Sequence, residues 1–203
     1  MPTKRTSSRT APAGRREEIL ATAAEVFARQ GYHATTVREI ADAAGMLAGS
    51  LYYHFDSKES MVDEILSGFL TELWEAYQAV LDAGLGPRET VEELVRESVR
   101  QIDRHGHAVA IYQRERGLAS EPRFKYLNES QERFESAWLE TLRRGVATGA
   151  FRADLDVRLA YRFLRDTVWV AASWYRPGGR LTADELASRY LTMVLEGLTP
   201  REA

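Results

Sequence analysis

Residues 35–66 read TTVREIADAAGMLAGSLYYHFDSKESMVDEIL, and this stretch decides the fold. Thr36 is followed three positions later by Glu39, which is the spacing of a capping box at a helix start. Apolar residues then recur at helical spacing until Gly45, which ends the helix. A turn leads to a second short helix, expected over 48–54. Two short helices joined by a glycine-containing turn predict a helix-turn-helix.

Helical periodicity continues on both sides of this stretch. We expect a preceding helix over 15–30 and a long following helix over 58–83, capped by Ser57 with Ser60. Glycine or proline separates the further helices, which are expected over 87–104, 108–117, 123–148, 156–175 and 182–197. No alternating strand and no internal repeat is recognised. The sequence therefore predicts an all-α protein with a three-helix DNA-binding domain over 15–60 and a second helical domain over 61–203.

Composition limits the classes of protein that fit. The chain has 203 residues, is 44% hydrophobic and lacks cysteine, which excludes a disulfide framework and a cysteine-based zinc site. No apolar run approaches the ~20 residues of a membrane span, and the N-terminus lacks the apolar region of a signal peptide. We therefore expect a cytoplasmic protein with no membrane partner.

The net charge of −3 conceals a basic N-terminus. Residues 1–14, rich in Ser, Thr and Pro, are expected to form a disordered basic arm. The first sixteen residues contain no acid and five bases: Lys4, Arg5, Arg9, Arg15 and Arg16. Such an arm fits contact with phosphates, although a solubilising tail explains it equally well.

In a helix-turn-helix the second helix enters the major groove and its early residues meet the base edges. Small residues there allow close approach to a thymine methyl group, hydroxyls and lysine bind phosphate oxygens, and a helix N-terminus attracts a phosphate. These criteria select Thr36, Ala48, Gly49, Ser50, Tyr52, Tyr53, His54 and Lys58. Taken singly, each of these residues also has an ordinary structural explanation, as a core or surface side chain.

The segment YRFLRDTVWVAASWYRPGG, residues 161–179, is unusually rich in arginine and aromatic residues. Arg162, Arg165 and Trp169 are spaced to share one helix face, and Asp166 offers an internal partner. Buried guanidinium groups need anionic partners, so the pattern favours a ligand with an apolar ring body and anionic groups. A dimer interface is the competing interpretation, because tryptophan and arginine are enriched at interfaces.

Enzymatic function is disfavoured. The chain has no Gly-rich phosphate loop, no serine nucleophile elbow and no HExxH motif, and its four histidines form no metal-ligand pattern. We therefore expect no metal site and no catalytic residues. An enzyme that binds acyl-coenzyme A is the alternative from another class.

The stretch T-T-V-R-E-I-A-D-A-A-G, followed after four residues by S-L-Y-Y-H-F-D-S-K-E, resembles the helix-turn-helix signature of TetR-type repressors. The resemblance implies a homodimer that binds double-stranded operator DNA and releases it when a small molecule binds the C-terminal domain. It places six of the residues selected above, Thr36, Ser50, Tyr52, Tyr53, His54 and Lys58, at the DNA-contact positions of the family. It also implies that residues 61–203 form a ligand-binding and dimerisation domain, in which the helix carrying Tyr112 and Gln113 lines the ligand pocket. Arg116, Arg123 and Lys125 add positive charge beside that helix, although a solvated charged surface explains them as well.

Residues 34–55, 111–124 and 165–179 together are similar to a group of actinobacterial TetR-type repressors of cholesterol and steroid catabolism. That likeness implies an effector and no other cofactor: a coenzyme A thioester of a steroid-derived indanedione propionate. The implied ligand contacts are Arg165 and Trp169, followed by Arg162, Tyr112, Gln113 and Trp174. A regulator of fatty-acid or drug-efflux genes, or an activator, is the alternative within the family.

Overall fold

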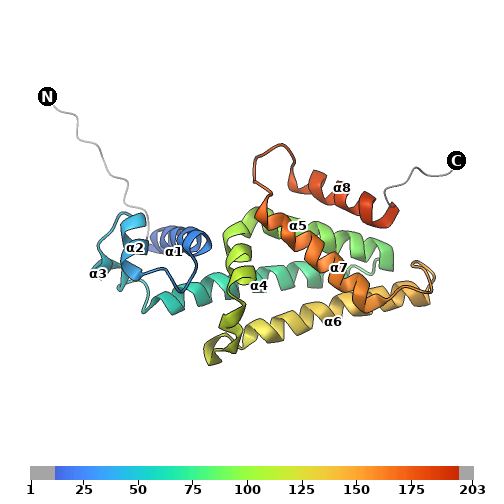
Figure 1. Ribbon diagram of the computed structural model, residues 1–203, viewed down its shortest axis with the longest axis horizontal. Helices are drawn as coiled ribbons and strands as arrows, with labels where there is room; N and C mark the ends of the chain where they lie inside the picture. The colour runs from blue at the N-terminus through green and yellow to red at the C-terminus, as the bar shows by residue number, and fades with distance from the viewer. Residues whose placement is uncertain (1–11, 197–203) are drawn as a thin grey trace.

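The computed structural model describes residues 12–196, and every regular element in that range is helical (Figure 1). The α-helices are α1 Pro12–Gln30, α2 Val37–Ala43, α3 Ala48–Leu51, α4 Lys58–Asp82, α5 Pro87–Arg114, α6 Tyr126–Ala147, α7 Val157–Trp169 and α8 Ala183–Glu196. Three short 3₁₀ helices complete the set: η1 Arg116–Ser120, η2 Pro122–Phe124 and η3 Val170–Ser173. The all-α prediction is confirmed.

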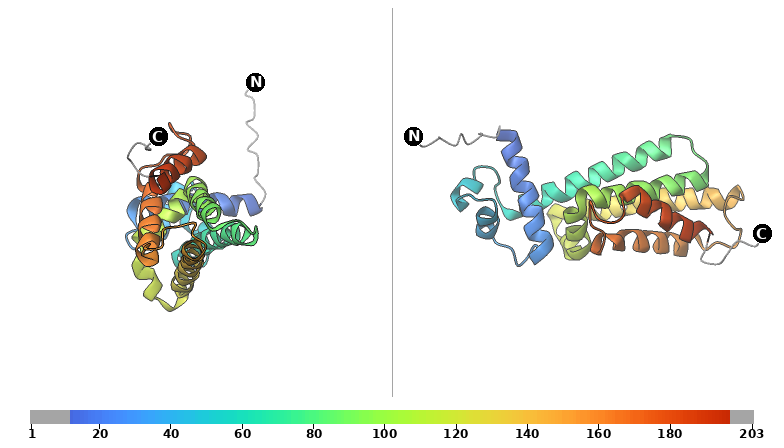
Figure 2. Two further views of the ribbon diagram at one scale, coloured as in Figure 1. Left: turned by 90° about the vertical axis from the view of Figure 1, so that its right-hand side faces the viewer. Right: turned by 90° about the horizontal axis from the view of Figure 1, so that it is seen from above.

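The molecule is elongated, with α1, α2 and α3 at one end and α5 to α8 at the other (Figures 1 and 2). Helix α4 begins at the first group and continues along the second. The predicted boundary at residue 60 thus falls inside one continuous helix, which joins the two parts. None of the helices within residues 12–196 is long and apolar enough to cross a bilayer.

The capping interactions predicted from sequence are present. The Thr36 hydroxyl accepts the Glu39 backbone N–H at 3.3 Å, and the Glu39 carboxylate accepts the Thr36 N–H at 2.7 Å. The Thr36 hydroxyl also donates to the Glu39 carboxylate at 2.8 Å, and this hydrogen bond, together with the one from the Thr36 N–H, holds the pKa of Glu39 below its usual value. Ser57 and Ser60 form the same reciprocal pair at the start of α4. Local sequence therefore sets where α2 and α4 begin.

Several helix boundaries differ from the prediction. Residues 12–14, assigned to the arm, form the first turn of α1, and residues 1–11 lie outside the described residues. Helix α5 runs through Gly106, where a break was predicted, and only kinks at His105 (φ −123°, ψ 32°). Glycine lowers helix stability by only about 1 kcal/mol, so packing on both sides of the kink keeps the helix continuous.

Helices α3 and α7 are shorter than predicted. Helix α3 ends at Leu51 instead of residue 54, and α7 ends at Trp169 with its last predicted turn forming η3. Tyr52 and Tyr53, which follow α3, are exposed, whereas η3 packs against α5. Helix ends commonly fray or finish in a 3₁₀ turn, which apolar periodicity does not reveal.

Gly31 is needed where α1 ends. Its φ of +93° lies in the left-handed region, and a Cβ there would come within 3.1 Å of the Arg114 guanidinium and 3.2 Å of the Glu115 carboxylate. The missing side chain lets the end of α5 approach the end of α1. The DNA-binding part and the ligand-binding part touch at this point.

Candidate DNA-binding surface and ligand cavity

Helix α3 is anchored by one side chain and exposes the rest. Leu51 is completely buried against the apolar core of the N-terminal helices, which includes Phe27 and Ile40. Gly49 and Ser50 are exposed, and Tyr52 and Tyr53 expose 56% and 90% of their surface. Exposed large aromatic side chains beside a small, polar helix face suit contact with a partner molecule. Four of the predicted DNA contacts therefore lie on one open surface.

The other predicted contacts flank α3. Thr36 lies exposed at the N-terminus of α2. Ala48 is partly buried and packs on the core, which leaves less of it available to a base. His54 is also partly buried, and its ring lies edge-on to Tyr53 at 5.5 Å. That contact holds the Tyr53 ring at the protein surface.

Lys58 has an internal partner set that the sequence did not reveal. Its ammonium group donates hydrogen bonds to the carbonyl oxygens of Tyr32 at 3.1 Å and Thr35 at 3.0 Å. It also lies 4.6 Å from the centre of the Tyr32 ring, within the range of a cation–π interaction. Lys58 therefore joins the start of α4 to the turn between α1 and α2, whether or not it also reaches a phosphate.

Two arginines that the sequence grouped with the basic arm instead bind the protein. Arg15 donates to the carbonyl oxygen of Ala44 at 2.8 Å, at the end of α2. Arg16 pairs with Glu64 through the two terminal nitrogens of its guanidinium group. This group also lies 4.5 Å from the Phe55 ring centre. Both residues tie α1 to the segments on either side of α3. These contacts therefore position α3, the expected recognition helix of the helix-turn-helix.

A cavity of about 670 Å³ lies among α4, α5, α6 and α7, within the size range of small-molecule sites. Its walls are mainly aromatic and aliphatic. They consist of Leu66, Phe69, Leu70, Leu73, Tyr77, Tyr112, Gln113, Glu115, Arg116, Ala119, Leu127, Asn128, Gln131, Phe134, Trp138, Tyr161, Arg165, Asp166, Trp169 and Val170.

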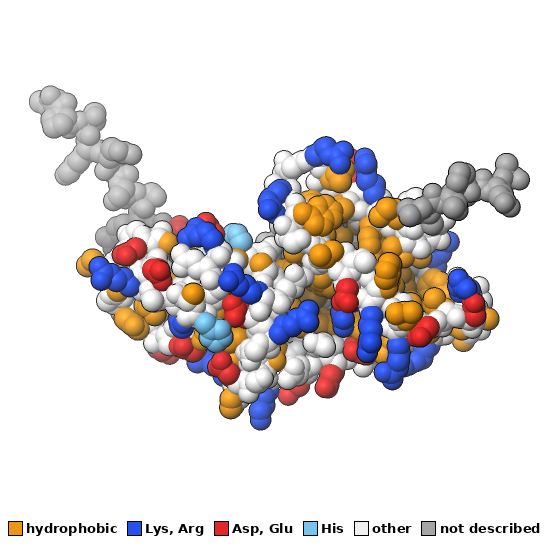
Figure 3. Space-filling view, in the orientation of Figure 1, with side chains coloured by type: hydrophobic (Ala, Val, Ile, Leu, Met, Phe, Trp, Pro, Cys, Tyr) orange, Lys and Arg blue, Asp and Glu red, His pale blue; other side chains and the backbone are white. Residues whose placement is uncertain are grey.

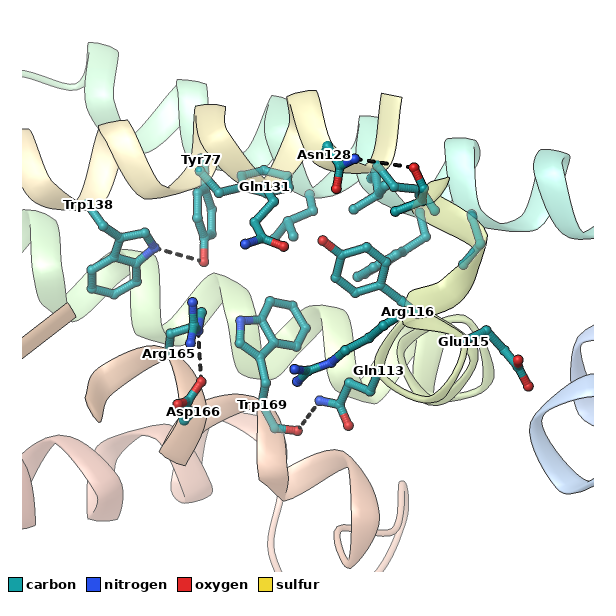
Figure 4. A pocket seen from close by; sticks show the side chains of 18 of the residues that line it. Tyr77, Gln113, Glu115, Arg116, Asn128, Gln131, Trp138, Arg165, Asp166 and Trp169 are labelled. Carbon is teal, nitrogen blue, oxygen red and sulfur yellow. Dashed lines mark hydrogen bonds and ion pairs between the residues drawn. The ribbon is translucent and has the colours of Figure 1, made fainter. Parts of the chain in front are cut away.

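Arg165 and Trp169 both line the cavity, as the sequence predicted (Figure 4). The Arg165 guanidinium donates to the Asp166 carboxylate at 2.7 Å and lies 5.3 Å from the Tyr161 ring centre. The Asp166 carboxylate raises the pKa of Arg165, which keeps the guanidinium charged. The Trp169 ring meets Phe69 edge-on at 6.1 Å. A cation and a flat aromatic wall thus lie one helical turn apart.

Tyr112 and Gln113 also line the cavity. The Gln113 amide donates to the Trp169 carbonyl oxygen at 2.8 Å, which ties the last turn of α5 to the end of α7 (Figure 4). Tyr112 meets Phe69 at a ring distance of 6.3 Å. Gln113 can therefore respond to any ligand that displaces Trp169.

Two predicted ligand residues lie elsewhere. The buried stripe of α7 contains Tyr161, Leu164 and Val168, and Arg162 lies beside it on the exposed side. Trp174 follows η3 and is 54% exposed. Neither Arg162 nor Trp174 lines this cavity, so the cavity does not support their assignment as ligand contacts, which stays a prediction. Arg165 lies on the cavity side of α7, whereas Arg162, three residues earlier, does not.

The positive charges expected near the pocket are distributed unevenly. Arg116 lines the cavity and points into it (Figure 4). Arg123 instead pairs with Asp63 at 3.2 Å on α4, and Lys125 is exposed and does not line the cavity. One of the three cations is therefore available to a bound anion.

Sequence reasoning missed the walls supplied by α4 and α6. Tyr77 is buried, its hydroxyl lies 2.6 Å from the Ser98 hydroxyl, and the Trp138 indole donates to it at 3.4 Å. Burial raises the pKa of Tyr77 to about 12. These residues occupy core-type positions of amphipathic helices, and only the crossing of the helices shows that they surround a cavity. Among residues 12–196, no group of three or more His, Asp or Glu side chains could hold a metal ion.

An open helix-turn-helix face joined by one long helix to a helical domain with an internal cavity defines a ligand-responsive DNA-binding regulator. Residues 19–65 match the family model "Bacterial regulatory proteins, tetR family", and residues 84–198 match "Tetracyclin repressor-like, C-terminal domain". The chain belongs to the TetR family of transcription regulators and is therefore a DNA-binding regulator, not an enzyme.

Two relatives and one solved structure show which members of the family this chain is most similar to among those compared. The chain is 56% identical, over 91% of each sequence, to the HTH-type transcriptional repressor KstR2 of Rhodococcus jostii. It is 50% identical to KstR2 of Mycobacterium tuberculosis over 91% of this chain and 93% of that one. The solved structure of the M. tuberculosis ketosteroid transcriptional regulator KstR2 has a TM-score of 0.88, with 47% identity, and covers 97% of this chain and all of that one.

Proposed function

We propose that this protein is a homodimeric repressor of steroid-ring catabolism genes, released from operator DNA by a coenzyme A thioester of a steroid-derived indanedione propionate. The similarity to KstR2 repressors, one of which is called a ketosteroid regulator, supports the steroid part. The observation that carries the proposal is the cavity, because it combines Arg165 and Arg116 with broad aromatic walls.

The cavity suits a fused-ring acid derivative. Flat apolar rings can lie against Trp169, Phe69 and Tyr112, whose faces and edges enclose the same space. The planar guanidinium fork of an arginine donates two parallel hydrogen bonds to carboxylate or phosphate oxygens. In our proposal, Arg165 binds a polar group of the acyl part and Arg116 binds a phosphate of coenzyme A.

The proposed operator contact is made by Gly49, Ser50, Tyr52 and Tyr53 of each protomer. Two such faces must meet successive major grooves, which lie about 34 Å apart on one side of a duplex. A dimer supplies both faces at once. Because the proposed function acts on operator DNA, we propose that the protein is cytoplasmic.

The dimer interface that we propose lies on α7 and α8. Figure 3 shows hydrophobic side chains gathered over these two helices. Leu159 and Phe163, four residues apart on α7, expose 63% and 61% of their surface, and Met193 on α8 exposes 53%. The two helices are tied together by a 2.6 Å hydrogen bond between the Thr167 and Tyr190 hydroxyls. An apolar stripe on such a paired surface fits a second copy of the chain.

Ligand binding would release DNA by shifting the balance between two shapes of the dimer. A ligand shifts this balance only by its difference in affinity for the two shapes. Displacement of α4 by a ligand in the cavity would change the separation of the two recognition helices, because α4 lines the cavity and also follows α3 directly.

An operator gel shift with and without the indanedione propionate thioester tests this function. We expect retardation of the operator by the protein alone and loss of the retarded band with thioester. Equal retardation in both lanes would dispose of the induction claim. A thermal-shift screen with long-chain acyl-coenzyme A and planar drugs tests the alternative effectors, and stabilisation by drugs alone would favour a drug-efflux regulator.

A further inference from the structure

The junction between the end of α5 and the start of η1 faces two functional parts of the molecule at once. Gln113, Glu115 and Arg116 line the cavity, and Arg114 and Glu115 also contact the end of α1. Figure 4 shows the Arg116 side chain pointing into the cavity and the Glu115 side chain pointing away from it, toward α1. Four consecutive residues therefore connect the ligand site to the DNA-binding part.

Glu115 makes the most direct contact across this junction. Its carboxylate accepts the backbone N–H of Tyr32 at 3.0 Å and lies 3.8 Å from the His33 ring nitrogen. The Glu115 side chain is only 10% exposed. A hydrogen bond from a backbone N–H to a sheltered carboxylate is stronger than one between neutral groups, and it is sensitive to displacement of either partner.

Tyr32 in turn is bound to the start of α4. Its carbonyl oxygen accepts from the Lys58 ammonium group at 3.1 Å, and its hydroxyl donates to the Glu59 carboxylate at 3.1 Å. Lys58 and Glu59 follow α3 within a few residues. The contacts of Tyr32 therefore form an unbroken path from Glu115 to the segment that carries the recognition helix.

We infer that Glu115 is a positioning residue, which holds the helix-turn-helix on the end of α5 and transmits ligand-induced movement of this junction to it. This inference rests on the proposed function. An anion that draws Arg116, or a ring that displaces Trp169 and its partner Gln113, shifts this junction, because Gln113 and Arg116 lie within two residues of Glu115 along the chain. The Glu115–Tyr32 hydrogen bond then pulls on the DNA-binding part and is itself lengthened and weakened.

The test uses full-length protein and three variants. Glu115→Ala removes the acceptor, Glu115→Gln retains an acceptor oxygen, and Glu132→Ala is the control because Glu132 is exposed on α6 and does not line the cavity. For each, operator affinity is measured with and without the indanedione propionate thioester, and thioester binding is measured separately by calorimetry.

In the parent and in Glu132→Ala, the thioester should weaken operator binding by a factor of about 5 to 150, the usual range for coupled sites. In Glu115→Ala this factor, measured at a thioester concentration that saturates each protein by calorimetry, should fall below about twofold, and Glu115→Gln should restore most of it. Full release of Glu115→Ala by the thioester would overturn the inference, and so would loss of thioester binding in that variant.

Hydrogen exchange of the Tyr32 amide supplies a measurement that needs no variant. Thioester binding to the parent should accelerate this exchange, and an unchanged rate would contradict the transmitting role. Should the parent neither bind nor respond to the thioester, the proposed function fails by itself. Tyr32 exchange in ligand-free Glu115→Ala then decides the positioning role: a faster rate supports it, and an unchanged rate overturns it.

Discussion

Lys58 binds Tyr32 in two ways, by donating a hydrogen bond to its carbonyl oxygen at 3.1 Å and by placing its ammonium group 4.6 Å from its ring centre. The same ammonium group donates to Thr35. DNA-binding proteins commonly use lysine to bind phosphates. Here the Lys58 ammonium group instead donates hydrogen bonds to the protein's own backbone. Variants at this position consequently report on folding as well as on DNA.

Replacement of Lys58 by Met should lower stability even without DNA. The methionine keeps most of the apolar stem but leaves two carbonyl oxygens without their charged donor. Hydrogen bonds to charged groups are worth about 1.5–3 kcal/mol each, so a loss of roughly 1–3 kcal/mol is expected in this partly exposed setting. Chemical denaturation of the free protein measures it. An unchanged unfolding free energy, together with weaker operator binding, would show that Lys58 acts on DNA alone.

Replacement of Tyr53 by Ala should affect DNA binding without affecting the fold. Tyr53 is 90% exposed, and exposed substitutions usually change stability by less than about 0.5 kcal/mol. Loss of a phosphate or base contact costs about 1–3 kcal/mol, so operator affinity should fall roughly tenfold or more in a gel shift. Retention of parental affinity would remove Tyr53 from the DNA surface.

Leu51→Ala is the contrasting variant on the same helix. Leu51 is fully buried, and leucine-to-alanine changes in a core cost about 2–5 kcal/mol. This variant should therefore lose operator binding through partial unfolding, and its circular dichroism melt should move to lower temperature. Comparison of Tyr53→Ala with Leu51→Ala therefore distinguishes a residue that contacts DNA from one that stabilises the fold.

Replacement of Arg165 by Gln should weaken the response to the effector and leave operator binding intact. The variant loses the guanidinium beside Asp166 in the cavity. Hydrogen bonds to a charged partner contribute about 1.5–3 kcal/mol, which corresponds to a loss of roughly tenfold or more in thioester affinity by calorimetry. Arg162→Gln, on the exposed side of the same helix, is the matched control. Equal losses in both variants would contradict the assignment of Arg165 to the ligand.

Replacement of Phe163 by Glu should convert the proposed dimer into monomers. Phe163 is 61% exposed in the single chain, so a glutamate there is tolerated by the fold but places a charge in an apolar interface. Light scattering should report half the parental mass, and operator affinity should fall because the two half-sites are no longer bound together. A parental mass for the variant would exclude this stripe as the interface.

The raised pKa of Tyr77 predicts that the stability of the folded protein declines at alkaline pH. Burial raises its pKa to about 12, whereas a tyrosine in the unfolded chain titrates near 10. Between these values the unfolded chain loses the proton and the folded protein keeps it, so stability present below pH 10 declines as the pH rises. One such proton changes the unfolding free energy by about 1.4 kcal/mol per pH unit.

Tyr77→Phe should remove that contribution from the slope between about pH 10 and 12. The Ser98 hydroxyl still donates to the Leu94 carbonyl oxygen at 2.8 Å, but the Trp138 indole N–H loses its acceptor, so the variant should lose about 1–3 kcal/mol at neutral pH. Urea denaturation at a series of alkaline pH values tests this. Identical slopes for parent and variant would show that another group controls the alkaline decline.

Local sequence determined the helices of this protein and the type of its N-terminal domain. Capping boxes such as Thr36 with Glu39, and apolar residues such as Leu51 at helical spacing, act within a few residues of each other, so their effect is visible in the chain itself. The same reasoning selected Arg165 and Trp169, which both line the cavity, because one short helix segment carries both residues.

Only the tertiary structure decided which side chains meet across the chain. The separation of Arg165 in the cavity from Arg162 in solvent, the enclosure by Tyr77 and Trp138, and the contact of Glu115 with Tyr32 all depend on how helices cross. Crossing is set by the packing of many side chains at once, and residues 83 positions apart, such as Glu115 and Tyr32, leave no periodic signal of their contact.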